Sequence, residues 1–310
     1  MKERHGACSL HGGGLTVGGY TDMKKTYMIP LFGTFLCWGS LYIVSKIALK
    51  TVPPVTLLAL RYCVAIPALL IILKLRGALR KMATGDVKTV FAIGFIGYFL
   101  SFCLQMLGIN RLTGSISSLL GAMNPIFIPI LASIFLREKL TAAKIACVAV
   151  SMVGVVTIVG VNGTVDALGA GFMLLSVFLW SSASVIIRRV SGKYDPMQVA
   201  MLGMVFALPF TGAWAMVELQ SAAFSLPLQS VLAVLFMGLV GTATAHTLWN
   251  TSLSLMDASF CSMFYPMQPL VAAVLGVLVL GEKITPNFLL GGAIICCGIV
   301  AAVLSGRKKA

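Results

Sequence analysis

Two ionisable side chains, Arg61 and His246, stand inside long apolar stretches of this sequence. Burying a charge among apolar groups costs free energy, so such residues commonly face a cavity or a polar partner. Arg61 could line a cavity or bridge two helices, and it could also extend its head group outward to water. His246, with an ordinary pKa of about 6.5, suits a proton-coupled step. The alternative for His246 is a neutral ring bonded to a neighbouring helix.

Other polar and aromatic residues recur at helical spacing around these two. Thr242, His246 and Trp249 would share one helical face with Asn250, because their spacing follows i, i+4, i+7 and i+8. Tyr98, Ser101 and Gln105 would do the same on a second segment. Trp38, Tyr42 and Trp180 could form aromatic walls for an amine or an aromatic cargo, or belong to an interfacial belt. The candidate cavity residues are therefore Trp38, Tyr42, Arg61, Tyr98, Ser101, Gln105, Asn124, Trp180, His246, Trp249, Tyr265 and Gln268.

Two prolines, Pro125 and Pro269, directly follow polar residues inside apolar segments. Proline has no N–H and frees the carbonyl one turn back, so each predicts a helix kink. A freed carbonyl is tolerated in an apolar medium where protein or a wet cavity satisfies it. The kinks could therefore mark a cavity or only shape the packing.

The composition explains why these residues need positioning inside a membrane. Of 310 residues, 59% are hydrophobic and only 10% are charged, against about 25% charged in a soluble domain. This excludes a soluble globular protein and a disordered chain. Long unbroken apolar runs favour helices over a β-barrel. The net charge of +14 does not indicate nucleic-acid binding, because the basic residues flank the apolar runs.

Ten apolar runs are each long enough to cross a hydrocarbon core of about 30 Å. They cover about 27–47, 55–75, 88–108, 114–136, 144–161, 168–188, 198–218, 229–250, 258–280 and 286–305. Residues 1–26 are expected to form a disordered cytoplasmic tail, in which Met23 is our candidate for the native start. His5, Cys8 and His11 in this tail are a weak metal pattern, and the sequence predicts no metal site and no cofactor.

Basic residues are distributed unequally between the short loops. With the N-terminus in the cytoplasm, 18 Lys and Arg residues fall in cytoplasmic segments and three in outer loops. This bias predicts that both termini are cytoplasmic, which requires an even number of spans.

The second half of the sequence repeats the first at a shift of 144 residues, or 142 near the start. Gly97 falls on Gly241, and Asn124-Pro125 falls on Gln268-Pro269. Five spans per repeat would invert the second copy relative to the first, as in many secondary transporters with a substrate site between the repeats. The predicted fold is therefore all-α, with ten transmembrane helices as two inverted five-helix repeats over 27–161 and 168–305.

Several short motifs resemble the drug/metabolite transporter superfamily, in its EamA-type ten-span form. They are Trp38-Gly39-Ser40 with Lys46, Arg61, Asn124-Pro125 with Glu138-Lys139, and Gln268-Pro269 with Gly281-Glu282-Lys283. The resemblance covers about 27–305. It implies alternating access around a central cavity, and a tenth span that packs or forms a homodimer.

The favoured function is a secondary transporter of small metabolites, an exporter of amino acids or related compounds. A carrier of organophosphates or nucleotide sugars is the alternative, although such anions want several basic groups in the cavity. A lipid-modifying membrane enzyme is a third possibility, but the sequence has no catalytic motif for one. The expected partners are the lipid bilayer, a small-molecule substrate and a coupled proton. The resemblance implies a bacterial cytoplasmic (inner) membrane.

Overall fold

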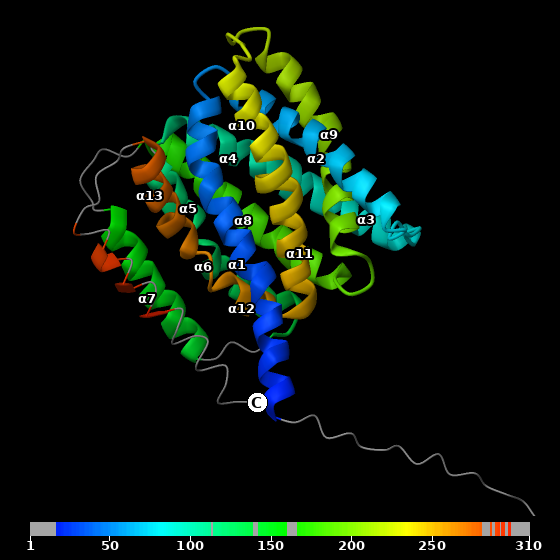
Figure 1. Ribbon diagram of the computed structural model, residues 1–310, viewed down its shortest axis with the longest axis vertical. Helices are drawn as coiled ribbons and strands as arrows, with labels where there is room; N and C mark the ends of the chain where they lie inside the picture. The colour runs from blue at the N-terminus through cyan, green and yellow to red at the C-terminus, as the bar shows by residue number, and fades with distance from the viewer. Residues whose placement is uncertain are drawn as a thin grey trace, which may run out of the picture.

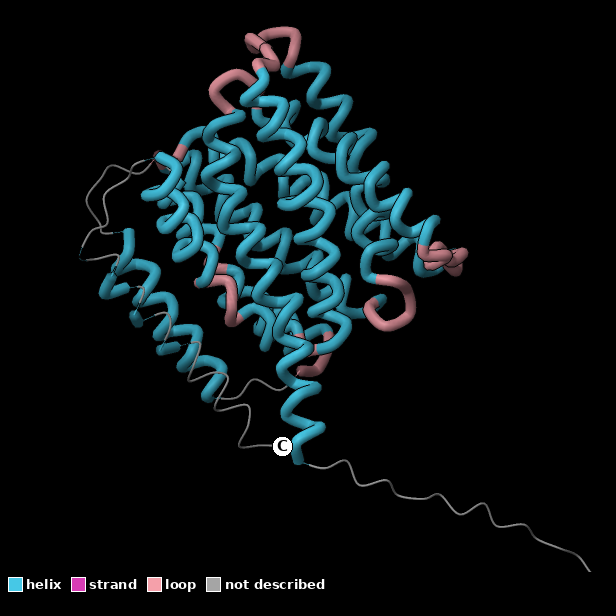
Figure 2. Tube along the Cα trace, viewed as in Figure 1, coloured by secondary structure: helices cyan, strands magenta, loops and turns pink. Residues whose placement is uncertain are grey.

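The protein is a bundle of helices in a computed structural model, which describes residues 17–112, 114–138, 142–159 and 166–280, with scattered positions between 286 and 298. These ranges contain no strand, and the loops gather at the ends of the helices (Figures 1 and 2). The elements are α1 (Val17–Ala48), α2 (Pro54–Leu75), α3 (Thr84–Ile93), η1 (Gly94–Ser101), α4 (Phe102–Arg111), α5 (Gly114–Gly121), α6 (Asn124–Phe135), α7 (Ala142–Val159), α8 (Ala167–Val190), α9 (Pro196–Glu218), α10 (Leu228–Gly238), η2 (Leu239–Thr244), α11 (Ala245–Leu255), α12 (Ala258–Ser262) and α13 (Met267–Leu280).

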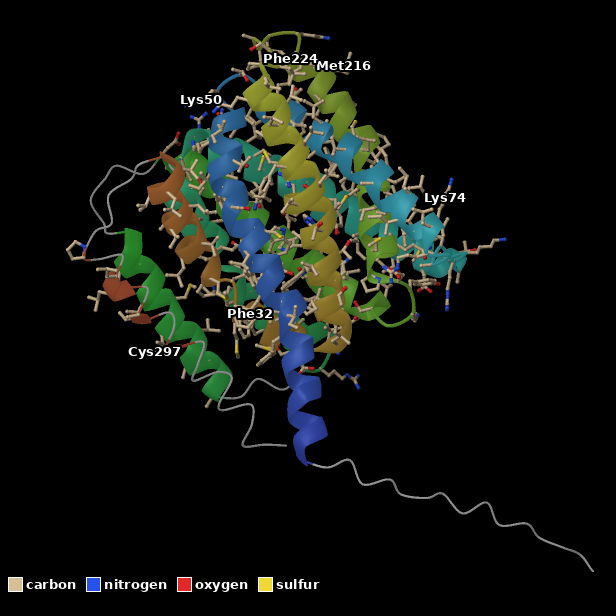
Figure 3. The ribbon with its side chains drawn as sticks, in the orientation of Figure 1. Phe32, Lys50, Lys74, Met216, Phe224 and Cys297 are labelled. Atoms are coloured by element: carbon tan, nitrogen blue, oxygen red, sulfur yellow. The ribbon has the colours of Figure 1, made fainter. Side chains whose placement is uncertain are left out.

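Seven helical stretches in the described residues are long and apolar enough to cross a membrane. They are Met28–Ala48, Pro54–Leu75, Thr84–Arg111, Ala167–Val190, Pro196–Glu218, Leu228–Leu255 and Ala258–Val279. The helical class predicted from composition is thus confirmed. Figure 3 shows side chains such as Phe32 and Met216 on the outside of the bundle, and Met216 is 67% exposed, as a lipid-facing residue would be.

The three other predicted spans, the fourth, fifth and tenth, are not among these seven stretches over their full predicted length. The fourth, 114–136, is divided into α5 and α6 by a turn at Ala122–Met123. The fifth corresponds to α7, which lies at the edge of the bundle in Figure 1. The tenth, 286–305, lies largely outside the described residues, as do Gly281, Glu282 and Lys283. The count of ten therefore stays a prediction. At the other end, α1 already begins at Val17 and so includes 17–26, which the sequence analysis assigns to the tail.

Polar caps and prolines define where several helices begin. Asp166 accepts hydrogen bonds from the backbone N–H groups of Leu168 (2.9 Å) and Gly169 (3.1 Å) at the start of α8. These N–H groups have no partner within the helix, so a carboxylate there stabilises the first turn. The same bonds, first that from Gly169, and the nearby Arg111 guanidinium lower the pKa of Asp166.

The packing pairs the two halves of the chain crosswise. Helix α1 packs against α11 and α13, and α8 packs against α4 and α6. The sequence shift exchanges these two sets, because it maps α1 onto α8, α4 onto α11 and α6 onto α13. Two close approaches follow the same rule. A side chain at Gly97 would overlap Ala183, and one at Gly241 would overlap Leu41. Each half thus provides the other with an equivalent contact.

Both halves also share a rare local irregularity. The segments η1 and η2 are π-helical, and they contain Gly97 and Gly241, which are partners under the shift. A π turn holds an extra residue, rotates the side chains that follow it and is often found at functional sites.

Two carboxylates join helices from different halves. Glu138 accepts hydrogen bonds from the backbone N–H groups of Ala258 (3.0 Å) and Ser259 (3.1 Å), and from the Ser259 hydroxyl (2.6 Å). Glu218, at the end of α9, binds the start of α2 in the same pattern. It accepts from the N–H groups of Val55 (3.2 Å) and Thr56 (2.7 Å), and from the Thr56 hydroxyl (2.8 Å). A negative charge at a helix N-terminus is favourable because the first N–H groups point toward it.

Replacing Glu218 by alanine should destabilise the folded protein. The change leaves two N–H groups at the start of α2 without their partner, at a cost of about 1–3 kcal/mol. The free energy of unfolding in detergent, measured by denaturant titration, reports this loss. Ser221→Ala in the exposed turn after α9 is the control and should leave that free energy unchanged. Equal stability of the two variants would contradict the assigned role of Glu218.

Candidate functional site

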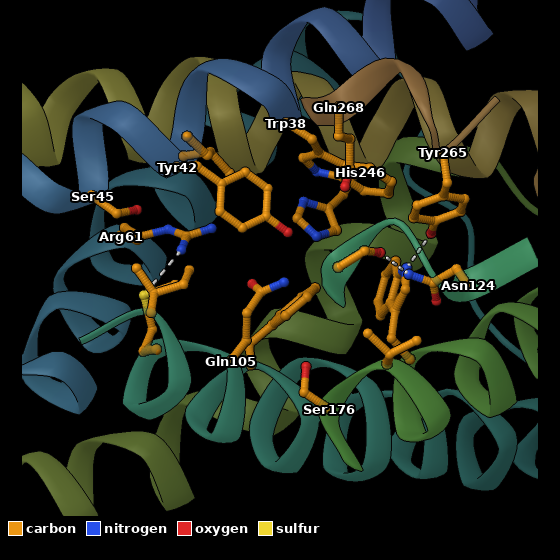
Figure 4. Close-up of a pocket in the computed structure, with 17 residues that line it drawn as sticks. Trp38, Tyr42, Ser45, Arg61, Gln105, Asn124, Ser176, His246, Tyr265 and Gln268 are labelled. Carbon is orange, nitrogen blue, oxygen red and sulfur yellow. Dashed lines mark hydrogen bonds between the residues drawn. The ribbon is translucent and has the colours of Figure 1, made fainter. Parts of the chain in front are cut away.

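A small cavity lies in the centre of the bundle, and both halves of the chain line it (Figure 4). The lining residues come from α1, α2, α4, α5, α6, α8, α11, α13 and the turn before α13. They are Trp38, Leu41, Tyr42, Ser45, Arg61, Phe102, Gln105, Met106, Ile109, Gly121, Asn124, Ser176, Val177, Trp180, His246, Tyr265 and Gln268.

The cavity is small in this conformation. The centre of a water-sized sphere can occupy about 40 Å³ of it, and one water needs roughly 10–15 Å³ on that measure. The space therefore holds a few water molecules. A larger guest requires the surrounding helices to move apart.

Arg61, from α2, is the charged side chain in the cavity wall. It is only 1% exposed, so its head group does not extend to water. Its Nε donates to Thr242 Oγ1 at 3.0 Å, and Nη1 lies 3.8 Å from the sulfur of Met106. Within the described part of the chain, no carboxylate forms an ion pair with it. An uncompensated buried charge is costly, so this guanidinium is suited to hold an anion.

His246 is fully buried beside Arg61. Its Nδ1 lies 2.8 Å from the carbonyl oxygen of Thr242. Because a carbonyl only accepts, this bond requires the proton on Nδ1, and Nε2 of the neutral ring is then an acceptor. Nε2 has no hydrogen-bond partner among the residues that the structure describes. The ring lies 5.4 Å from the Trp38 ring and 5.5 Å from the Trp180 ring, centroid to centroid.

Aromatic rings close the end of the cavity opposite Arg61. Phe102 and Trp180 have centroids 4.8 Å apart, and Trp38 lies 5.9 Å from both Trp180 and Tyr265. Trp180 Nε1 donates to the Tyr265 hydroxyl at 2.7 Å. This bond joins α8 to the turn before α13 and fixes both rings.

The turn before α6 brings Asn124 to the cavity. Pro125 stands in the first turn of α6, where a missing N–H costs little. The carbonyl that it leaves free, that of Gly121, accepts from Asn124 Nδ2 at 2.7 Å. Asn124 Oδ1 in turn accepts from the Ser181 hydroxyl at 2.9 Å. Before Pro269, the backbone N–H of Gln268 donates to the Tyr265 carbonyl at 2.9 Å. Both prolines thus follow breaks whose carbonyls the protein satisfies.

The structure brings together nine of the twelve candidate residues from the sequence. These are Trp38, Tyr42, Arg61, Gln105, Asn124, Trp180, His246, Tyr265 and Gln268. Tyr98, Ser101 and Trp249 are buried but do not line the cavity. Ser101 donates to the Ser176 carbonyl at 2.9 Å, and the Trp249 ring packs 5.5 Å from that of Trp38.

Sequence analysis did not single out several lining residues, of which Ser45, Ser176 and Gly121 are polar or small. Ser45 is one helical turn after Tyr42, and Ser176 is one turn before Trp180, so their spacing from predicted residues could have identified them. Gly121 could not be found in this way. It matters because a side chain there would overlap the Tyr42 hydroxyl.

The sequence model of the EamA-like transporter family matches residues 25–160 and again residues 167–304. An "Uncharacterized transporter" of Archaeoglobus fulgidus is 25% identical over 291 residues, which are 93% of this chain and 100% of the relative. A "Probable amino-acid metabolite efflux pump" of Salmonella typhimurium is 22% identical over 88% of this chain and 93% of its own length. One solved crystal structure aligns with a TM-score of 0.77 at 19% identity, over 92% of this chain and 99% of its own. This last similarity shows the fold.

Gly121→Ala should test how tightly the cavity wall is packed. The added methyl group overlaps Tyr42, and overpacking of this kind costs about 1–3 kcal/mol. We expect the free energy of unfolding to fall by that amount. Gly171→Ala is the matched control, because a side chain at Gly171 of α8 meets open space and alanine favours a helix. If Gly121→Ala is as stable as Gly171→Ala, Tyr42 does not occupy its assigned position.

Proposed function

The chain belongs to the EamA-like transporter family, and on this premise we propose that it exports amino acids or related metabolites across a membrane by alternating access. Seven apolar helices and the family make it an integral membrane protein. The family and the names of the relatives indicate a transporter rather than an enzyme.

The small cavity between the halves of the chain carries this proposal. It is enclosed by helices from both halves, and its wall contains a buried cation and several unpaired polar atoms. A polar cavity too small for a metabolite in its closed form fits a cycle in which the halves rearrange to expose it to each side in turn.

The crosswise packing supports two inverted five-span repeats, over 27–161 and 168–305. Exchanging the halves by the sequence shift reproduces the contacts of α1 in those of α8, and the two π-helical segments coincide. Equivalent contacts of this kind arise when two repeats are related by a two-fold axis. Rocking about such an axis gives two conformations of similar energy that open to opposite sides.

Amino acids and export are proposed from the relative in Salmonella typhimurium, a "Probable amino-acid metabolite efflux pump". The unequal distribution of Lys and Arg favours cytoplasmic termini, and bacterial relatives favour the inner membrane.

Counterflow into proteoliposomes tests transport directly. Vesicles loaded with an unlabelled amino acid should accumulate the labelled form, and Arg61→Ala should lower the initial rate at least about tenfold because it removes the cavity charge. Lys46→Ala is the control, since Lys46 is a cation on α1 outside the cavity lining. If folded protein shows no counterflow for any of the twenty standard amino acids or their hydroxy-acid analogues, the proposal is rejected.

His246 is our proposed site for a coupled proton. The other titratable groups that line the cavity or touch its ring are Arg61, Tyr42, Tyr98 and Tyr265, and histidine alone ordinarily titrates near neutral pH. Counterflow should depend on pH in the native protein and be independent of pH in His246→Gln. A pH profile unchanged by the substitution would assign His246 a structural role.

A further inference from the structure

We propose that the cargo is a small monocarboxylate with a hydrogen-bond donor on its α-carbon and an apolar side chain, and that Arg61 binds its carboxylate. This inference rests on the proposed transport function and names the substrate class of the same cavity. Apolar α-amino acids and α-hydroxy acids both have this chemistry.

Unused donors at one end of the cavity define the carboxylate position. Arginine has five N–H groups. Two of those of Arg61 point to Thr242 and Met106, and the other three have no partner in the described protein. The Ser45 hydroxyl is buried and unpaired, and Figure 4 shows it beside the Arg61 guanidinium. A guanidinium fork binds the two oxygens of a carboxylate in parallel, and a hydroxyl adds a further donor.

The charge of the cavity limits the charge of the cargo. Arg61 is the one Lys or Arg among the lining residues that the structure describes, and none of these is acidic. One carboxylate on the cargo therefore compensates the charge of Arg61. A phosphate dianion would leave an uncompensated negative charge in an apolar bundle, which is costly. This favours a monocarboxylate over the organophosphates considered as the alternative.

Thr242 connects Arg61 to His246, whose ring has an unpaired acceptor. Its hydroxyl accepts from Arg61, and its carbonyl accepts from His246. Both side chains are thus anchored on one residue, and the unpaired Nε2 belongs to a ring that lines the same cavity as Arg61. A second unpaired acceptor, Gln268 Oε1, is also buried, and Figure 4 shows it next to the His246 ring. An N–H or O–H group on the carbon next to a carboxylate would reach such acceptors.

Much of the remaining cavity wall is aromatic, beside the polar side chains of Gln105, Asn124 and Ser176. Trp38, Trp180 and Tyr265 enclose the end away from Arg61, and the bond between Trp180 and Tyr265 fixes two of these rings. Their faces bury apolar groups well and have little capacity to bind a second anion. An apolar side chain of the cargo fits these rings, and an acidic one would meet no second cation among the described lining residues.

Competition for counterflow tests each part of this chemistry. Labelled L-leucine is the first probe and labelled L-phenylalanine the second. The competitors for leucine are L-leucinamide, which has no carboxylate, 4-methylpentanoate, which has no α-donor, and 2-hydroxy-4-methylpentanoate, which keeps both features. We expect the amide and 4-methylpentanoate to compete at least about tenfold more weakly than leucine, since each loses a bond to a buried polar or charged group. The hydroxy acid should compete within a few fold of leucine.

Two substitutions assign these preferences to residues. Arg61→Gln should weaken the competition by unlabelled leucine and make it no stronger than the competition by leucinamide. Lys46→Gln should change neither of these. His246→Phe keeps an aromatic ring but removes Nε2, so it should remove the advantage of leucine over 4-methylpentanoate and retain the advantage over leucinamide. Gel filtration and thermal unfolding of each variant show that it is folded. Where Arg61→Gln does not fold, the competitor series on the native protein still tests whether the cargo needs a carboxylate.

The outcomes separate this inference from the transport proposal. Equal competition by the amide and the acid, with counterflow present, would overturn the carboxylate assignment and leave transport intact. Counterflow of glutamate or a sugar phosphate, but of neither leucine nor phenylalanine, would overturn the substrate class alone. No counterflow of any solute by folded protein would reject the transport function, and this inference with it.

Discussion

The constraint on which the rest of this structure depends is a guanidinium inside an apolar helical bundle, for which the described residues provide no counter-ion. Arg61 can remain charged there only if neutral dipoles surround it, because moving a charge away from water is costly. Thr242 provides one of these dipoles, and it does so from a π-helical segment. Its hydroxyl donates to the carbonyl of Met237, five residues earlier, at 2.7 Å, so that its oxygen lone pairs are available to Arg61. The π-helical segment thus positions a hydrogen-bond acceptor for the Arg61 guanidinium.

The same need for precise placement explains why the halves of the chain are bonded at their helix ends. The pair α2 and α9 is held at both of its ends. Glu218 binds the start of α2, and near the start of α9 Gln198 exchanges two hydrogen bonds with the backbone of Arg80, in the loop that follows α2. Any rearrangement that opened the cavity while keeping these bonds would move the other helices around this pair.

Much of the fold could be predicted from the sequence, because apolar length and repeated polar residues report directly on spans. The residues that line the cavity were harder to predict from the sequence. Trp38, Arg61 and His246 were predictable because each is unusual in an apolar segment. Tyr98 and Ser101 were placed on the face of Gln105 by a period of 3.6 residues, but both lie in η1, where the extra residue per turn rotates them away. The overlap between Gly121 and Tyr42 arises between distant helices, so no local pattern could reveal it.

The carboxylate caps have a consequence for how such a chain can diverge. Glu138 and Glu218 are each one side chain, but most of what they bind is main chain, at Ala258 and Ser259 and at Val55 and Thr56. A junction between two side chains requires both residues to change together, whereas a junction to N–H groups survives any replacement on the receiving helix except proline. Residues at the start of the receiving helices can therefore be replaced one at a time. The contact between the halves is kept because it uses backbone N–H groups.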